Sequence, residues 1–202
     1  MKKIFALLII ALAAVSASAQ FRYGATVGAA FSTLHFKQDL IDVSGNVGPE
    51  LGVQGEMMFP GLGFGLDIGL LYQMRGAHVN LGQKEVWASQ GFGNENVMLH
   101  NITIPIDLRF KWTRMNGLED YVAPFVFGGP VFSFNAGSNC GDAFKFAGGD
   151  LGIQAGLGFE ILKRWQVQAA YNWGMTFALK TKILDDFSAR SRYWSVRVVR
   201  FF

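Results

Sequence analysis

Apolar and polar or small side chains alternate along almost the whole chain after residue 20. In residues 152–177, aliphatic and aromatic side chains occupy every second position on both sides of the Lys163-Arg164 pair, with glycine, glutamine or glutamate at most positions between them. Successive side chains of a β-strand point to opposite faces, so a period of two predicts amphipathic strands. Two such runs joined by a short polar pair predict a hairpin. The sequence therefore predicts an all-β fold.

Eight alternating runs follow one another: residues 21–32, 50–59, 63–75, 102–112, 121–134, 152–161, 165–177 and 192–202. The fifth run is apolar on both faces and contains Gly128-Gly129-Pro130, which predicts a bulge or bend. The connections alternate between short (60–62, 113–120, 163–164) and long (37–46, 76–97, 135–149, 179–191). Outer-membrane barrels have short periplasmic turns and longer outer loops. This rhythm predicts an eight-stranded antiparallel up-and-down transmembrane β-barrel.

The two faces of these strands differ in composition, which indicates the one that lies inside. One face is nearly uncharged and made mostly of large aliphatic and aromatic residues, whereas the other combines charges with many of the 25 glycines. An eight-stranded barrel is just wide enough to be filled by side chains, and glycines leave room for paired charges. We therefore expect the apolar face to meet lipid. The expected structural cluster in the lumen is Glu50, Glu56, Asp67, Arg75, Asp107, Arg109, Lys111, Glu160 and Arg197.

Aromatic residues gather at both ends of the predicted strands, as in the interfacial girdles of membrane barrels. The short-turn end and the long-loop end each carry a band of such rings. The residues expected at the membrane interfaces are Tyr23, Phe59, Tyr72, Trp112, Trp165, Trp173, Trp194 and Phe202.

The first 19 residues have the pattern of a secretory signal peptide. Lys2 and Lys3 precede an apolar stretch that ends in Ala17-Ser18-Ala19, an A-x-A cleavage signature. We expect residues 1–19 to be removed, leaving one barrel domain over residues 20–202. Removing two lysines lowers the formal charge from +3 to +1, which disfavours a nucleic-acid partner. The expected location is the Gram-negative outer membrane, and the expected partners are its lipid and the machinery that inserts barrels.

Four segments resemble successive hairpins of the PorT-like outer-membrane β-barrel family, which is common in Bacteroidetes. They are NITIPIDLRFKW (101–112), YVAPFVFGGPVFSF (121–134), DLGIQAGLGFEI (150–161) and QVQAAYNWGMTF (166–177). The family's Ile-Pro, Gly-Pro and Tyr-x-x-Gly patterns are matched by Ile104-Pro105, Gly129-Pro130 and Tyr171 with Gly174. The resemblance implies an outer-membrane barrel. The name-giving member is linked to type IX protein secretion, but these motifs are structural, so the secretion role is not transferred.

The last residues, RVVRFF, resemble the C-terminal signal that the outer-membrane assembly machinery reads. Phe202 fits the expected terminal aromatic, whereas Arg200 interrupts the alternating apolar positions before it.

Chemistry-bearing residues form no recognisable motif. The three histidines, His35, His78 and His100, have no metal-site spacing, and Cys140 is the only cysteine. We therefore expect no metal, no cofactor and no catalytic residue. The function favoured is a small non-enzymatic barrel with a structural, adhesion or envelope-docking role through its long outer loops.

Two alternatives remain open. One is an outer-leaflet lipid-modifying enzyme that uses Ser32, Thr33, His35 and His100. The other is a soluble lipocalin-type binding barrel, whose inward face would be apolar.

Overall fold

The structure is a computed structural model that describes residues 20–36, 42–59, 61, 63–80, 94–139, 144–146, 148–176, 179–181 and 188–202. Residues 1–19, Cys140 and Phe177 lie outside these ranges, and so does the predicted cleavage site before Gln20. Within the described ranges, no helix is long and apolar enough to span a membrane.

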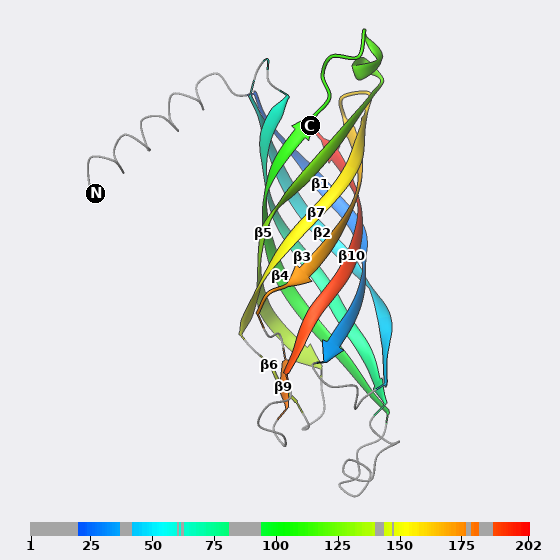
Figure 1. Ribbon diagram of the computed structural model, residues 1–202, viewed down its shortest axis with the longest axis vertical. Helices are drawn as coiled ribbons and strands as arrows, with labels where there is room; N and C mark the ends of the chain where they lie inside the picture. The colour runs from blue at the N-terminus through cyan, green and yellow to red at the C-terminus, as the bar shows by residue number, and fades with distance from the viewer. Residues whose placement is uncertain are drawn as a thin grey trace, which may run out of the picture.

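Eight long strands form the wall of a closed barrel (Figure 1). They are β1 (Gln20–Phe36), β2 (Asp42–Met58), β3 (Phe64–Asn80), β4 (Asn94–Lys111), β5 (Val122–Asn139), β7 (Gly149–Ile161), β8 (Trp165–Gly174) and β10 (Ser188–Phe201). Each pairs antiparallel with the next, and β10 pairs back with β1, for example through Val198 opposite Val27. This closure confirms the predicted eight-stranded up-and-down barrel.

Two short strands and one helical turn lie outside the barrel wall. Strands β6 (Phe144–Phe146) and β9 (Leu179–Thr181) pair with each other at the long-connection end. A 3-10 turn, η1 (Leu118–Asp120), lies in the connection between β4 and β5. The start of β1 and the end of β10 lie at the same end as the short turns.

The strands extend well into the segments predicted as long loops, so those loop bounds are wrong. Strand β2 begins at Asp42, β3 continues to Asn80, β4 begins at Asn94 and β5 continues to Asn139. Backbone pairing persists there, with Asn80 opposite Asn94. Alternating hydrophobicity reveals a strand only where one of its faces is apolar. Hydrogen bonding between neighbouring strands does not need an apolar face and continues beyond that part.

Gly128-Gly129-Pro130, where the sequence predicts a bulge or bend, forms no bulge. Strand β5 keeps one register against β7 through these three residues, and its register against β4 is unchanged on either side of them. A Cβ on Gly129 would overlap the carbonyl oxygen of Ile106, so this glycine allows β5 and β4 to approach closely. The register instead shifts between Gly45 and Glu50 and between His100 and Asn101.

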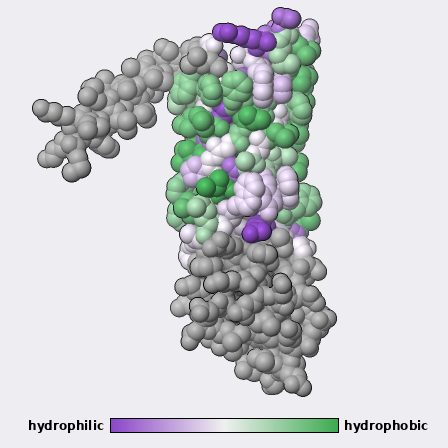
Figure 2. All heavy atoms as spheres, viewed as in Figure 1, coloured by the Kyte–Doolittle hydropathy of each residue, from purple (hydrophilic) through white to green (hydrophobic). Residues whose placement is uncertain are grey.

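Apolar side chains face outward along the barrel wall and polar ones face inward. Figure 2 shows hydrophobic residues spread over the visible wall and hydrophilic ones gathered at the short-turn end. The lipocalin alternative requires an apolar interior, whereas the described interior is lined mostly by polar and charged side chains. Apolar side chains also fill part of the lumen: Phe125 and Phe127 of β5 are buried there while Val126 faces out, and Leu71 of β3 and Phe201 of β10 are buried as well.

Glycines on β7 make room for the two inward rings of β5. A Cβ on Gly158 would lie 2.5 Å from Phe125 Cζ, and one on Gly156 would lie 2.5 Å from Phe127 Cζ. Large and small side chains therefore alternate across this part of the lumen, which keeps an interior this narrow filled without overlap.

We predict that Gly158→Ala destabilises the barrel by about 1–3 kcal/mol, because overpacking forces rings and backbone to move. Denaturant unfolding in detergent, followed by heat-modifiable gel migration, measures this change. Gly137→Ala is the matched control, since the nearest atom to its Cβ would be His100 Cδ2 at 4.0 Å. Equal stability of both variants would contradict the packing described.

Candidate functional site in the barrel lumen

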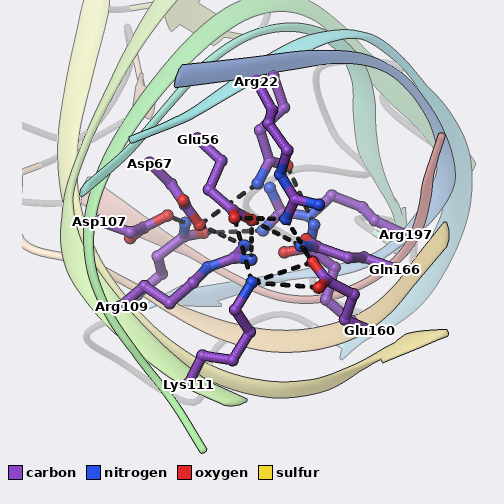
Figure 3. A network of polar contacts seen from close by, with 12 residues as sticks. Arg22, Glu56, Asp67, Asp107, Arg109, Lys111, Glu160, Gln166 and Arg197 are labelled. Carbon is purple, nitrogen blue, oxygen red and sulfur yellow. Dashed lines mark hydrogen bonds and ion pairs between the residues drawn. The ribbon is translucent and has the colours of Figure 1, made fainter. Parts of the chain in front are cut away.

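The structure places all nine predicted lumen residues inside the barrel, each with less than a tenth of its surface exposed. They come from five strands: Glu50 and Glu56 from β2, Asp67 and Arg75 from β3, Asp107, Arg109 and Lys111 from β4, Glu160 from β7, and Arg197 from β10. Because side chains alternate along each strand, inward positions on neighbouring strands meet at shared levels. Ion pairs and hydrogen bonds join these charges to one another or to other inward side chains, and Figure 3 labels seven of the nine.

Glu56 is the centre of the cluster nearest the short-turn end. Its carboxylate accepts a hydrogen bond from Arg109 Nη1 at 2.5 Å, and Lys111 Nζ lies 3.3 Å from it. Arg22 Nη2 approaches the same carboxylate at 2.5 Å. Arg109 also pairs with Asp67, and its guanidinium stacks over the Phe125 ring at 4.0 Å. Three cations therefore share one fully buried carboxylate.

Glu160, on the opposite side of the lumen, contacts two of these three cations. Lys111 Nζ lies 3.1 Å from its carboxylate and Arg22 Nη2 lies 2.5 Å from it. Gln166 donates to both carboxylates, at 2.6 Å to Glu56 and 2.8 Å to Glu160. Since Glu56 belongs to β2 and Glu160 to β7, these contacts join strands on different sides of the barrel (Figure 3).

Further pairs continue the network toward the long-loop end. Glu50 lies 3.4 Å from Arg197 and accepts a hydrogen bond from Ser195 at 2.7 Å. Asp107 accepts a hydrogen bond from Gln154 at 2.6 Å.

Arg75 forms the ion pair nearest the long-loop end of this network. It lies 3.6 Å from Asp150 and over the Tyr193 ring at 4.8 Å. Ion pairs and hydrogen bonds thus follow one another along much of the lumen.

The network also contains residues beyond the nine: Arg22, Asp150, Gln154, Gln166 and Ser195. The alternation puts Arg22, Gln154, Gln166 and Ser195 on the inward face of their strands, and Asp150 lies one position before the alternating run that begins at residue 152. The sequence gives no signal for which inward residue contacts which, because that depends on the register of strands far apart in the chain.

The lumen opens at the short-turn end into a cavity of about 490 Å³. Arg22, Glu56, Lys111 and Glu160 line it, so the cavity ends on the ion-pair cluster. Within the described residues, no three His, Cys, Asp or Glu side chains are placed to hold a metal ion. The arrangement can hold strands in register and obstruct passage through the barrel.

The eight aromatic residues predicted for the membrane interfaces all lie on the outside or at the ends of the wall. Seven are exposed and Phe59 is partly exposed. Trp173 and Trp194 both pack against Tyr171, with ring centroids 4.5 and 4.9 Å apart. At the opposite end, the ring centroids of Tyr23 and Phe202 lie 6.1 Å apart. Their contact with the lipid interface stays a prediction.

The residues proposed for a lipid-modifying enzyme are only partly described. Ser32 faces the lumen, where its hydroxyl contacts the backbone of Gly76 at 2.8 and 2.9 Å. His100 lies on the outer side of the wall, with Nδ1 2.6 Å from the hydroxyl of Tyr72. Ser32 and His100 therefore occupy opposite faces of the sheet. The side chains of Thr33 and His35 lie outside the described part of the chain.

We predict that Arg109→Met lowers the free energy of unfolding by about 3–5 kcal/mol, because it leaves Glu56 and Asp67 buried without a shared cation. Denaturant titration of the detergent-solubilised barrel measures the loss. Arg114→Met serves as the control, since Arg114 is exposed and, among the described residues, donates only to the carbonyl of Gly61. We expect this control to change stability by less than about 0.5 kcal/mol. A similarly small effect of Arg109→Met would show that the network contributes little.

Comparison with known proteins supports the fold and the family. The chain is 15% identical to a major outer membrane protein from Thermus thermophilus, with a TM-score of 0.55, covering 90% of this chain and 99% of that one. It is 13% identical to the outer membrane protein OprG from Pseudomonas aeruginosa, with a TM-score of 0.53, covering 90% and 94%. At these identities the likeness concerns the fold alone. No curated protein is significantly similar in sequence. Residues 4–198 match the outer membrane protein beta-barrel domain, and the chain therefore belongs to this family of outer-membrane barrels.

Proposed function

We propose that this outer-membrane barrel is closed to diffusion and acts through its long-loop end, as a structural, adhesion or envelope-docking element. The observation that carries the proposal is the ion-pair network across the lumen. Lys111 and Arg22 each contact both Glu56 and Glu160, so the cations occupy the space through which a solute would pass. Water-filled porins use about twice as many strands.

The length of the strands supports a role for the long-loop end. Strand β3 has 17 residues, which at about 3.3 Å per residue and a tilt of about 40° gives a height of about 40 Å. The apolar band of an outer-membrane barrel is about 25 Å tall. Outward apolar positions of β3 run from Phe64 to Met74, and the strand continues to Asn80. The sheet thus extends beyond the lipid at this end, which we assign to the cell exterior.

We predict that the purified barrel forms no porin-sized channel in planar bilayers. Lys111→Gln is expected to produce small conductance steps, because it removes one of the two cations that bridge Glu56 and Glu160 across the lumen. Lys163→Gln is the control, since Lys163 pairs with Asp120 on the surface at the rim. Porin-sized steps from the unaltered protein would exclude the closed barrel.

A second prediction concerns the outer end itself. Replacing residues 81–93, between β3 and β4, with a two-residue Asn-Gly turn should leave the barrel folded, because such a turn suits a hairpin. In a deletion strain, this variant should fail to restore envelope resistance to detergent or attachment to surfaces. The unaltered chain should restore both. Full restoration by the shortened barrel would contradict a role for this connection.

Cysteine labelling in the same cells tests which end of the barrel faces the cell exterior. Cys140 comes directly after Asn139, the last residue of β5, in the sequence, and a membrane-impermeant maleimide should label it on intact cells. A Leu118→Cys variant that also carries Cys140→Ala places the thiol in η1, at the short-turn end, where Leu118 is exposed. It should react only after the outer membrane is permeabilised. The reverse labelling pattern would invert the proposed orientation.

The finer assignments complete the proposal. We assign residues 1–19 to a cleaved signal peptide and residues 20–202 to the barrel domain, supported by the start of β1 at Gln20. We assign the chain to the PorT-like barrel family, which is common in Bacteroidetes, and the Ile-Pro, Gly-Pro and Tyr-x-x-Gly motifs support this assignment. Its proposed partners are outer-membrane lipid and the barrel assembly machinery. The mass of the mature protein tests the cleavage site directly.

A further inference from the structure

The outward face of the barrel is almost free of charge. Among the outward side chains of the eight barrel strands that the structure describes, only Arg192 and Arg200 carry a permanent charge, and both belong to β10. A charged side chain that faces lipid is costly near the middle of a membrane and much less so near its interfaces. Arg200 is therefore a feature of the wall that needs an explanation. It is also the residue that does not fit the C-terminal signal.

Arg200 lies beside aromatic rings that belong to the band predicted for the membrane interface. Its guanidinium lies over the ring of Trp165 at 5.4 Å and over that of Phe202 at 5.8 Å. Both rings are exposed and belong to the aromatic band at the short-turn end. Arginine buries its aliphatic stem along apolar surface and keeps its guanidinium in a polar layer. The headgroup region meets both requirements.

A second arginine is held beside the first by the backbone. The amide of Phe201 donates to the carbonyl of Arg164 at 2.8 Å, which fixes the turn between β7 and β8 against the end of β10. Between them lies a cavity of about 340 Å³. It is lined by Arg22, Lys163, Arg164, Arg200, Phe201 and Phe202.

Two of the four cations that line this cavity make no ion pair among the described residues. Arg22 is paired with Glu56 and Glu160, and Lys163 with Asp120. Arg164 and Arg200 form no ion pair with any carboxylate in the described ranges. Guanidinium groups bind phosphate through paired, charge-assisted hydrogen bonds. The site therefore favours an anionic ligand that carries phosphate.

We propose that Arg164 and Arg200 bind the headgroup phosphate of an anionic phospholipid in the leaflet at the short-turn rim. Such a lipid places its phosphate in the cavity and its acyl chains along the outward apolar side chains of β10. A free phosphate gains only the first of these contacts. The assignment of this leaflet to the periplasmic side depends on the orientation proposed above, whereas the binding itself depends only on membrane insertion.

The test compares lipid binding to the detergent-solubilised barrel by native mass spectrometry and by lipid-induced thermal stabilisation. The probes are phosphatidylglycerol, phosphatidylcholine with the same acyl chains, and inorganic phosphate. We expect tighter binding of phosphatidylglycerol than of phosphatidylcholine. Arg164→Gln and Arg200→Gln should each weaken phosphatidylglycerol binding about fivefold. The double variant should bind phosphatidylglycerol no better than phosphatidylcholine.

The matched control is Arg114→Gln, which removes an exposed cation at the same end of the barrel but outside the cavity. It should leave phosphatidylglycerol binding unchanged. Equal binding by the double variant and the unaltered barrel would overturn the proposal, as would no preference between the two lipids. Stabilisation by inorganic phosphate equal to that by phosphatidylglycerol would overturn the lipid assignment and identify a phosphate site that does not recognise lipid.

Two further measurements separate this proposal from others. Heat-modifiable migration shows whether Arg200→Gln, close to the C-terminal signal, still folds. If it does not, Arg164→Gln in the turn tests the site alone. The conductance and labelling experiments described above address the closed lumen and the orientation, so either can fail while lipid binding persists.

Discussion

The structure depends on one constraint: a backbone that crosses lipid must satisfy its own hydrogen bonds. Pairing β10 with β1 meets this constraint, because it leaves the sheet without an open edge. Closure with eight strands also fixes a narrow interior. That interior must be filled by the inward half of the same alternating strands whose other half faces lipid. The fold and the contents of the lumen thus follow from a single requirement.

The lumen is filled by pairing large groups with small ones and cations with anions. Gly156 and Gly158 leave space for two phenylalanine rings, and one of these rings supports the guanidinium of Arg109. That guanidinium then joins Glu56 and Asp67. Isolated charges at this depth would be costly, whereas shared ones are stabilised by their neighbours. Packing and ion pairing in the lumen therefore depend on each other. Removing the ring that supports Arg109, or removing a cation, disturbs the other contacts of the cluster.

Alternation in the sequence was enough to predict the strand number, the two faces and the position of all nine charged lumen residues. It could not predict where strands end, because β2 to β5 continue beyond the segments that have one apolar face. It also misinterpreted Gly129, whose role is a close approach to Ile106 rather than a bulge. The contacts of Arg22 with Glu56 and Glu160 depend on strands 34 and 138 residues away in the chain, so no local pattern encodes them.

Those long separations have a consequence for how the protein folds. Arg22 lies in the first strand, and one of its two carboxylate partners arrives only with β7. The cluster is therefore incomplete until β7 has joined the sheet. Contacts between residues this far apart in sequence slow folding, because a long stretch of chain must close before they form. Water thus leaves the centre of the barrel as β10 pairs with β1. Closure of the wall and filling of the lumen are therefore one cooperative step.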